Sequence, residues 1–425
     1  MDGRAASQTI TDKIPHFLAA GIELVVLSGV SGLKDKRFEH HQLWCAGPAG
    51  LRFELRHVLQ RRWSKGWVYR TLLLLASIVL LPFMLLEKLL KPVESSWSWW
   101  ISAYLKGRAL ARQQPFDLIY STGGAFAAHV AAAALKQATG MPWLAEVHDP
   151  LVAPGRRPVN AQEREQARVE ALICSQADVA IWFTQQALTS ARLRHPQLGQ
   201  RGHVMLPGVD QPFDNLPPYV PEPKMVVGHF GSLSAQRNLT PFFKALELVQ
   251  QQVPSMLEQL LFHITGGPLD AVSAAYLSGM SPHAQAVVQH FGRLEFDPQT
   301  GMSGRQQILK RMRSSDVLLL LHGQEAMCAE YIPSKMYEYL WMQRPILATV
   351  QRNPQMADIL RGQGHIVIDQ DEAVAANLAS QLMQLHTRWS QAGLPDSGQG
   401  SPYTTQAAVG HLLSLVQGTS TFRRK

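Results

Sequence analysis

Short apolar runs alternate with helical patterns along most of the chain, and their order predicts an α/β protein. A strand at 116–122, a helix at 125–138 and a strand at 143–149 form a βαβ unit, in which a crossover helix joins two parallel strands. A further strand is expected at 22–27. A second series is expected at 225–230, 260–264, 287–292, 316–321 and 364–368. Each series is typical of a Rossmann-like domain.

The boundary between the two series is a proline-rich stretch at 216–224, which predicts a stiff, extended linker. We therefore expect an N-terminal Rossmann-like domain over 1–215 and a C-terminal one over 225–400. The final segment, 401–425, carries an apolar run at 407–416 that should pack back against the first domain. The stretch at 390–402 is rich in Gly, Ser, Pro and Gln and should be loose. A chain of 425 residues suits two domains, because single cores stop growing near about 250–300 residues.

The cysteines and the N-terminus indicate a cytoplasmic protein. Three cysteines stand far apart, without metal-ligand spacing, so neither a disulfide framework nor a zinc site is suggested. Charged residues interrupt the first thirty positions before any sustained apolar run, which argues against a secretory signal.

The net charge of +8 comes from one region, 51–112. This region holds eleven basic residues against three acidic ones, an excess equal to the charge of the whole chain. The basic residues are Arg52, Arg56, Arg61, Arg62, Lys65, Arg70, Lys88, Lys91, Lys106, Arg108 and Arg112. Such a local excess predicts an anionic partner. Nucleic acid is disfavoured, because the region is built around an aliphatic run rather than exposed aromatic residues along a groove.

The run at 71–86 is strongly apolar. As a helix these positions reach about 24 Å, which is short of the roughly 30 Å hydrocarbon core of a bilayer. A single crossing is also disfavoured, since the expected strands at 22–27 and 118–120 lie on either side of the run and strands of one sheet cannot lie on opposite sides of a membrane.

Cationic residues and indoles flank this run. The tryptophans are Trp63, Trp67, Trp97, Trp99 and Trp100. An apolar body with cationic margins and interfacial indoles is typical of a segment that lies in, or dips into, an anionic membrane face, here over 61–100. A buried core helix or a dimer contact is the alternative.

The stretch at 330–350 sets two carboxylates, Glu330 and Glu338, around the segment Ile332-Pro333-Ser334-Lys335. Proline fits best in the first turn of a helix, so a helix should begin near Ser334 and run to about Met342. The unpaired amides and the dipole of its N-terminus predict a seat for a phosphate or diphosphate. Glu338 falls one turn inside this helix.

This stretch resembles the Glu-x7-Glu signature of retaining family-4 glycosyltransferases, in the form E-x-x-P-S-K-x-x-E-Y-L-x-x-x-x-P-I-L-A. The resemblance implies the GT-B fold, two Rossmann-like domains facing an interdomain cleft. It also implies that Glu330 faces the donor sugar and that Glu338 holds the nucleotide ribose. The intervening backbone, with Pro333, Ser334 and Lys335, would bind the diphosphate. The chain departs from the family at 341–344, where Trp341, Met342, Gln343 and Arg344 replace small residues and a glycine.

Other parts of the chain repeat the order of motifs in this family. His148 follows a predicted strand where a family histidine touches the donor sugar, and Gly231 and Arg237 lie in the loop aimed at the diphosphate. Arg293 lies where family members contact the base. Gly3 could be the remnant of a glycine-rich loop, which implies that the usual first strand is absent. The alternatives are a structural histidine at a strand end, solvated loop arginines and a frayed terminus.

Asp369-Gln370-Asp371 matches the D-x-D metal motif of another glycosyltransferase fold. These aspartates lie between a predicted strand and a helix at 372–385, where Asp371 is expected to cap the helix. We therefore expect no metal and no cofactor besides the nucleotide-sugar substrate. The charge of the leaving group would be met by the helix N-terminus near Ser334, by Lys335 and by Arg237.

The sequence thus predicts a cytoplasmic, peripheral membrane glycosyltransferase that moves a sugar, with retention, from a nucleotide donor to a lipid-linked or membrane-adjacent acceptor. Polysaccharide or glycolipid synthesis is the corresponding process. Two alternatives remain open. One is a GT-B sugar-nucleotide epimerase, and the other is an inactive sugar-nucleotide-binding subunit that anchors a partner enzyme.

Overall fold

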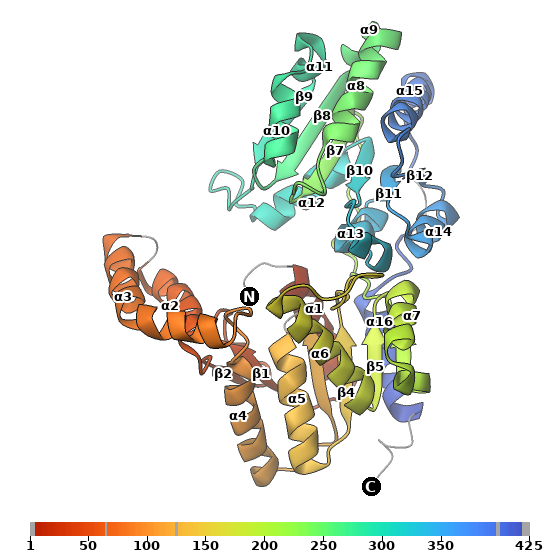
Figure 1. The fold of residues 1–425 in the computed structure, drawn as a ribbon. Helices are drawn as coiled ribbons and strands as arrows, with labels where there is room; N and C mark the ends of the chain where they lie inside the picture. The colour runs from red at the N-terminus through yellow and green to blue at the C-terminus, as the bar shows by residue number, and fades with distance from the viewer. Residues whose placement is uncertain (1–4, 64–65, 124–125, 397–399, 419–425) are drawn as a thin grey trace. The chain divides into compact units, whose positions relative to one another are not determined.

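The computed structural model describes the chain apart from residues 1–4, 64–65, 124–125, 397–399 and 419–425 (Figure 1). Contacts divide the chain into two compact units. Unit 1 comprises Met1–Pro207 and Thr405–Lys425, and unit 2 comprises Gly208–Thr404. Each unit is built on a sheet whose strands are all parallel, as the sequence predicts.

The main sheet of unit 1 has the strand order β3-β4-β5-β6. Its strands are β3 (Ile119–Gly123), β4 (Trp143–Val147), β5 (Val179–Trp182) and β6 (Gly202–Val204). The helices along this part of the chain are α5 (Phe126–Thr139), α6 (Ala161–Gln176), α7 (Gln185–Arg194) and the 3-10 turn η1 (Pro196–Arg201). The strands predicted at 116–122 and 143–149 and the helix between them are confirmed, with small shifts of their ends.

Both faces of this sheet are buried. Alternate residues of β4 and β5 serve the two faces, because successive side chains of a strand point to opposite sides. Trp143 and Trp182 belong to the core on one face. Leu144 and Ile181 belong to the other, where they pack with residues of α1 (Ala5–Ala19) and of the last helix, α16 (Thr405–Gly418).

A separate two-stranded sheet corrects one expectation. The strand predicted at 22–27 forms as β1 (Val25–Gly29), but it pairs with β2 (Glu39–Leu43) and belongs to a different sheet from β3. β2 has the sequence EHHQL, which is too polar for an apolar pattern to reveal. The argument that placed 22–27 and 118–120 in one sheet therefore rested on a wrong premise.

The basic region forms a helical hairpin. Helix α2 (Pro48–Trp63) packs against α3 (Trp67–Leu90), and α4 (Trp99–Gln113) follows. α3 has 24 residues, or about 36 Å at 1.5 Å per residue, so the length of about 24 Å taken from the apolar run alone was too short. The helix continues through charged residues at both ends. Among the described residues it is the one helix long and apolar enough to cross a membrane, and none of its apolar window is buried.

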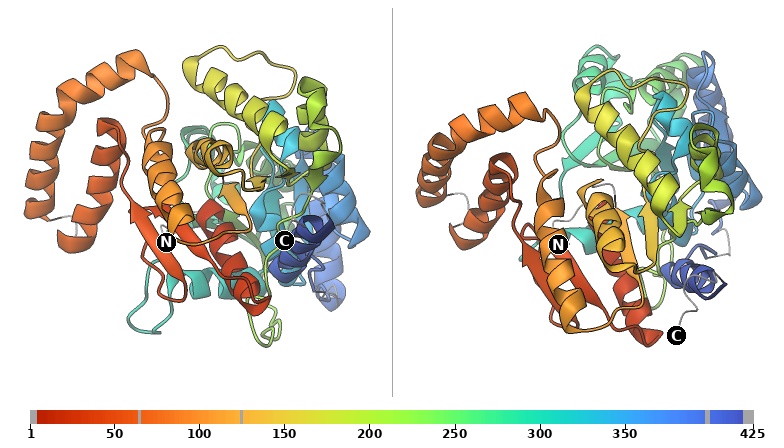
Figure 2. Two further views of the ribbon diagram at one scale, coloured as in Figure 1. Left: turned by 90° about the horizontal axis from the view of Figure 1, so that it is seen from below. Right: turned by 60° about the horizontal axis from the view of Figure 1, so that its bottom comes forward.

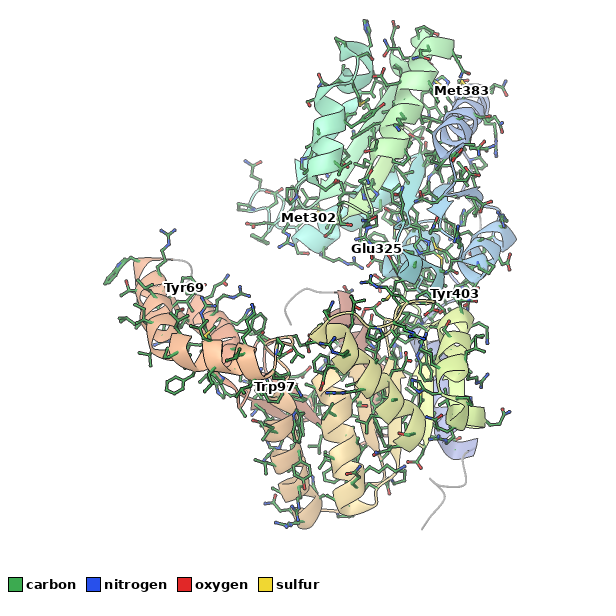
Figure 3. All side chains as sticks on the ribbon, viewed as in Figure 1. Tyr69, Trp97, Met302, Glu325, Met383 and Tyr403 are labelled. Atoms are coloured by element: carbon green, nitrogen blue, oxygen red, sulfur yellow. The ribbon has the colours of Figure 1, made fainter. Side chains whose placement is uncertain are left out.

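The five tryptophans near this hairpin differ in how exposed they are. Trp63 and Trp67 lie near its free end and are 42% and 78% exposed. Trp97 lies at its base (Figure 3). Its Nε1 donates to Glu87 Oε1 at 2.7 Å, and Lys91 lies over its ring. Trp99 and Trp100 begin α4 and are partly buried. Trp97 is partly buried and packs against the core of unit 1, so it contributes less exposed indole to this surface than Trp63 and Trp67.

Unit 2 contains a six-stranded sheet in the order β12-β11-β10-β7-β8-β9. Its strands are β7 (Met225–Gly231), β8 (Leu260–Gly266), β9 (Val288–Gly292), β10 (Val317–Leu321), β11 (Ile346–Val350) and β12 (Ile366–Asp369). Its helices are α8 (Thr240–Gln252), α9 (Pro254–Leu257), α10 (Ala271–Ser278), α11 (Pro282–Ala286), α12 (Gly304–Ser314), η2 (Ala326–Glu330), α13 (Ser334–Trp341), α14 (Pro354–Gly362) and α15 (Val374–Ala392). The five strands predicted in this part of the chain are confirmed.

Of the four residues at 341–344 that depart from the signature, Trp341 and Arg344 make specific contacts within unit 2. Trp341 Nε1 donates to Val209 O at 2.6 Å. The guanidinium of Arg344 is fully buried, lies 3.5 Å from the ring centre of Tyr219 and donates to Asp396 Oδ1. Large side chains thus fill space behind α13 that small residues would leave empty.

The tail at 390–402 is not loose where the structure describes it. Leu394 is buried in the core of unit 2, and Asp396 accepts two hydrogen bonds from Arg313, at 2.7 and 2.6 Å. Burial raises the pKa of Asp396, but Arg313 and Arg344 lower it below its usual value. Composition suggested a flexible segment, and this charge pairing overrides it.

Gln343 follows α13 with φ at +54°, in the left-handed region that favours glycine. We expect Gln343→Gly to raise the free energy of unfolding of unit 2 by about 1 kcal/mol, because the strain of a side chain at positive φ is removed. Differential scanning calorimetry measures the change. Gln363→Gly is the matched control, since Gln363 follows α14 with a negative φ and should gain nothing. Equal stabilisation by both substitutions would contradict this explanation.

Candidate active site

Helix α13 lies where the proline pattern predicts, with Pro333 as the residue before its first turn. Tyr339 fixes it beneath the sheet of unit 2: its hydroxyl accepts from Phe230 N of β7 at 3.0 Å and lies 3.4 Å from Leu319 O of β10. Within the described residues no side chain caps the N-terminus of α13, and Ser334 at its start is exposed. The amides of this first turn therefore face a position that suits an anion.

The segment that enters α13 is held by groups at the carboxyl ends of two strands. Asn353, after β11, donates to Tyr331 O at 2.9 Å. His322, after β10, accepts from Gln351 N through Nδ1 at 3.1 Å, so its proton is on Nε2, which lies 3.2 Å from the same carbonyl oxygen. Burial lowers the pKa of His322 to about 4, which keeps this tautomer neutral. Glu330 immediately precedes Tyr331 and is 1% exposed.

Glu338 lies one turn inside α13 and is held by two cations. Arg305 Nη1, at the start of α12, lies 2.8 Å from Glu338 Oε1, and Lys335 Nζ lies 2.6 Å from Oε2. Burial raises the pKa of Glu338, but the charges of Lys335 and Arg305 lower it below its usual value. The carboxylate is thus ionised, and the Lys335 side chain lies on Glu338 rather than in front of the helix.

Gly231 ends β7, and Arg237 lies in the loop that follows. Gly231 has φ at +148°, and a Cβ there would meet open space. Arg237 donates from Nε and Nη2 to Ser232 O, at 3.2 and 2.9 Å. Its charge also acts on His322, whose pKa it lowers beyond the effect of burial. The structure therefore brings Arg237 to the same end of the sheet as Tyr331 and His322.

The remaining predicted residues of the donor site are Arg293 and Gly3. Arg293 is exposed after β9, the edge strand, and β7 and β8 separate it from β10. The next residue, Leu294, lies against the start of α12. A Cβ at Gly304, the first residue of that helix, would lie 2.1 Å from Leu294 O. Arg305 of α12 reaches Glu338, so the start of α12 lies beside both the loop of Arg293 and Glu338. Gly3 lies outside the described residues.

In unit 1, His148 follows β4 and is mostly buried. Its ring stacks on Phe183, with centres 4.7 Å apart, and its Nε2 lies 2.8 Å from Glu146 Oε1 and 2.9 Å from Thr122 Oγ1. An ionised carboxylate only accepts hydrogen bonds, so Nε2 carries the proton and Nδ1 is the ring nitrogen turned from Glu146.

Glu146 is the centre of a buried cluster that sequence reasoning missed. It is fully buried and forms an ion pair with Lys13 of α1, which is 1% exposed. Tyr120 donates to its Oε2 at 2.6 Å, and Thr122 donates to its Oε1 at 2.9 Å. Burial raises the pKa of Glu146, but Lys13 and His148 hold it well below its usual range. The cluster fixes the orientation and tautomer of His148.

The residues that sequence reasoning missed are Lys13, Glu146, Arg305, His322 and Asn353. All but Glu146 act through a partner far away along the chain, so spacing along the sequence carries no signal for them. Glu146 alone had a usable feature, since a charged residue inside an otherwise apolar strand needs a partner when both faces are covered.

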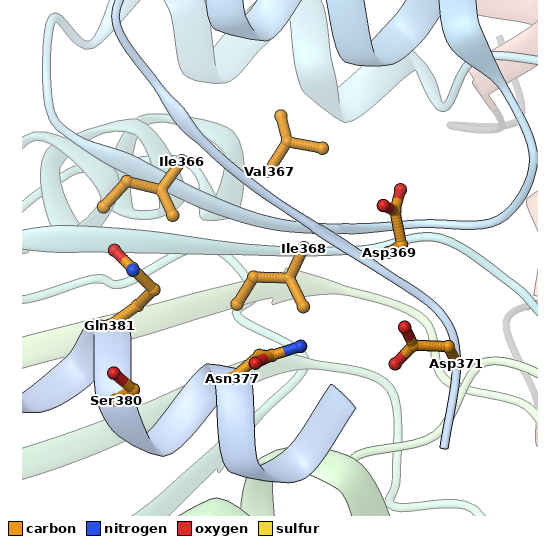
Figure 4. A pocket seen from close by; sticks show the side chains of 8 residues that line it. All are labelled: Ile366, Val367, Ile368, Asp369, Asp371, Asn377, Ser380 and Gln381. Carbon is orange, nitrogen blue, oxygen red and sulfur yellow. The ribbon is translucent and has the colours of Figure 1, made fainter. Parts of the chain in front are cut away.

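The aspartates of the D-x-D pattern line a shallow hollow of about 270 Å³ between β12 and α15, together with Asn377, Ser380 and Gln381 of that helix (Figure 4). Asp371 accepts from Ala373 N at 2.9 Å, and α15 begins only at Val374. Asp371 thus closes the turn before the helix, and the expectation that it caps a helix at 372 is wrong. Among the described residues no group of three or more His, Cys, Asp or Glu could hold a metal ion.

The chain was compared with known proteins. No family model matches it, and no curated protein matches its sequence. Solved structures of TarM are similar: one is 14% identical with a TM-score of 0.53 over 76% of this chain. Another, an S. aureus TarM mutant in complex with fondaparinux, α-GlcNAc-glycerol and UDP, is 12% identical with a TM-score of 0.52 over 78% of this chain. The matches cover 58% and 60% of those two chains, which is less than two thirds of their length.

A UDP-forming α,α-trehalose-phosphate synthase from Burkholderia vietnamiensis is 12% identical, with a TM-score of 0.48 over 78% of this chain and 75% of its own. The likeness to TarM establishes the fold: this chain has the α/β GT-B fold, with two Rossmann-like units.

We expect Lys13→Met to lower the free energy of unfolding of unit 1 by about 3–5 kcal/mol, because it leaves the carboxylate of Glu146 buried without its cation. Adding Glu146→Gln should recover part of the loss. Urea denaturation followed by tryptophan fluorescence suits unit 1, which holds all the tryptophans except Trp341 and Trp389.

The matched control is Lys136→Met. Lys136 pairs with Asp178 nearer the surface, and its loss should cost less than about 1 kcal/mol. The loss in Lys13→Met should shrink as the pH falls from 7 to 5, since an unpaired buried carboxylate takes up a proton more readily than an unfolded one. A loss that is the same in both lysine variants would contradict a special role for the buried pair.

Proposed function

We propose that this chain is a retaining glycosyltransferase of the family-4 type, which takes a sugar from a nucleotide donor. One observation carries the proposal: the uncapped N-terminus of α13 lies between the buried carboxylates Glu330 and Glu338. The GT-B fold shared with TarM supports it, and a TarM structure holds UDP and α-GlcNAc-glycerol.

The donor diphosphate would bind at the start of α13, where the amides of Ser334 and Lys335 and the positive end of the helix dipole favour an anion. Arg237 supplies a further positive charge, in a planar group suited to phosphate oxygens. No metal or cofactor is required in this proposal, because these groups meet the charge of the leaving nucleotide.

The two glutamates would have different roles. Glu338 is ionised, so it can accept hydrogen bonds from the ribose hydroxyls, and Arg305 keeps it in that state. Glu330 would face the donor sugar. For His148 we propose a hydrogen bond between Nδ1 and a sugar hydroxyl, with Glu146 as the residue that positions its ring.

The acceptor would be lipid-linked or would lie next to a membrane, on the cytoplasmic face, as in polysaccharide or glycolipid synthesis. The support for this is the exposed apolar surface of α3 in the most basic region of the chain. Exposed apolar patches of this kind mark protein–protein or membrane interaction sites.

We expect Glu338→Ala to weaken UDP binding by about tenfold or more, because it removes an ionised hydrogen-bond acceptor from the ribose. Glu330→Ala should leave UDP binding within about twofold and abolish sugar transfer. Thermal shift with UDP and UDP-sugars measures binding, and radiolabelled donors with a lipid extract measure transfer.

Glu372→Ala is the control, since Glu372 is an exposed acid of the same unit. Normal turnover in both Glu330→Ala and Glu338→Ala would overturn the site. Binding of UDP-sugar without transfer in the wild-type chain would favour the sugar-nucleotide-binding subunit instead.

The pH dependence of UDP binding tests the role of Arg305. Glu338 has a lowered pKa and therefore stays ionised as the pH falls through the usual range of a glutamate, about 4.3. Arg305→Met removes one cation and raises that pKa, so the loss of UDP affinity on acidification should begin at a higher pH. Isothermal titration between pH 7 and pH 5 measures it, with Arg361→Met as a control on an exposed arginine of α14. An unchanged profile in Arg305→Met would show that Arg305 does not set the charge of Glu338.

A further inference from the structure

Helix α3 has one side that contacts α2 and a much wider side that contacts nothing described. The residues on the side toward α2 are partly buried and recur every three or four positions: Tyr69, Leu73, Ser77, Leu80, Met84 and Glu87. The outer side is apolar and 51–67% exposed at eight positions: Leu74, Leu75, Ile78, Val79, Leu81, Phe83, Leu85 and Leu86. At 3.6 residues per turn, successive residues are about 100° apart around the helix axis. Viewed along that axis, the outer side extends from the direction of Leu81 to that of Phe83, an arc of roughly 200°.

The base of the hairpin is fixed to unit 1. Glu87 accepts from Ala49 N and from Trp97 Nε1, both at 2.7 Å, and Gly47 N donates to Ser98 Oγ at 2.8 Å. The chain thus enters α2 and leaves α3 at one place, and the hairpin projects from it (Figures 1 and 2). A second bond, from Arg52 Nε to Ser77 Oγ at 2.8 Å, ties the two helices midway.

Charges at both ends of α3 restrict how it can meet a bilayer. Arg70 and Lys88 are exposed at its two ends, and no charged residue lies between Arg70 and Glu87. Insertion by the tip would bury Arg62 and Arg70 deepest, which is costly in hydrocarbon. If α3 crossed the membrane, α2 would have to cross with it, because the two helices form one hairpin. α2 carries four arginines: Arg52, Arg56, Arg61 and Arg62.

We propose that the α2–α3 hairpin lies along the surface of an anionic membrane, with α3 parallel to the bilayer plane. The outer side of α3 rests at the boundary of headgroups and acyl chains, and the cations at its ends lie among the headgroups. A lipid surface fits better than a second copy of the chain, because one partner helix covers a stripe of about 100° and the apolar arc is about twice as wide. The inference concerns the partner of the hairpin and stands whether or not the chain transfers sugar.

Flotation of the full chain with lipid vesicles tests the surface. Wild type should float with vesicles of phosphatidylcholine and phosphatidylglycerol, and Leu75→Asp/Val79→Asp should reduce the bound fraction by more than about tenfold. Leu193→Asp is the matched control, since Leu193 is 78% exposed on α7 and should not affect binding. Arg62→Gln and Arg70→Gln should each weaken binding about fivefold, with anionic vesicles only.

A thermal shift with UDP is recorded for every variant. If a variant loses flotation but keeps its thermal shift with UDP, the result supports the membrane-binding surface independently of the donor site. If the chain floats but shows no thermal shift with UDP, the result speaks against the proposed function and leaves the membrane surface in place. If wild type does not float and instead forms a dimer that Leu75→Asp/Val79→Asp dissociates, α3 is an interface between copies and the proposal is overturned.

The orientation is tested by depth. Cysteines introduced one at a time at Leu74, Ile78 and Leu85 fall on one side of α3 and span about 16 Å along it. Labelled with an environment-sensitive fluorophore, they should be quenched equally by lipids that carry quenchers at a given depth. A steady gradient in depth from Leu74 to Leu85 would show an inserted or crossing helix and would overturn the in-plane orientation.

Discussion

Ionised carboxylates without full access to water must be matched by cations, and this constraint sets the geometry of both units. Glu146 takes Lys13 from α1, Glu338 takes Arg305 from α12, and Asp396 binds two arginines of unit 2. Burial raises the pKa of each carboxylate, and the paired cations more than reverse the effect. Because removing one partner of such a pair costs far more than the pair contributes, each acts as a constraint on where its elements lie.

The same constraint shapes the start of α13. Lys335 would be free to approach an anion in front of the helix, but it lies on Glu338 together with Arg305. The amides of the first turn are left without a side-chain cap, and Arg237 lies at the same end of the sheet. His322 and Asn353 hold the carbonyl of Tyr331, so contacts within unit 2 fix the segment that enters the helix. The start of α13 is thus held by hydrogen bonds to the segment before it and by ion pairs one turn inside it.

Sequence patterns predicted what depends on local order. The parallel strands and the start of α13 at Ser334 follow from apolar runs and one proline, and the structure confirms them. Lys13 and Arg305 were missed because their partners lie 133 and 33 positions away, on other elements. Strand β2 was missed because it is polar. The tail was misjudged because composition does not reveal the pairing of Asp396.

For helix α3 the sequence was a good guide: it shows an apolar run, and the structure adds that this run is exposed. Burial of such residues is worth roughly 25 cal/mol per Å² of apolar surface, so a helix left open over most of its circumference forgoes stabilisation that a folded core would supply. Its hydrogen bonds to α2 and its anchored base show that it is held in this position by specific contacts. A helix held with its apolar side outward marks an interaction site. In our proposal a lipid surface covers it, and the cations at its two ends set the angle at which that surface can approach.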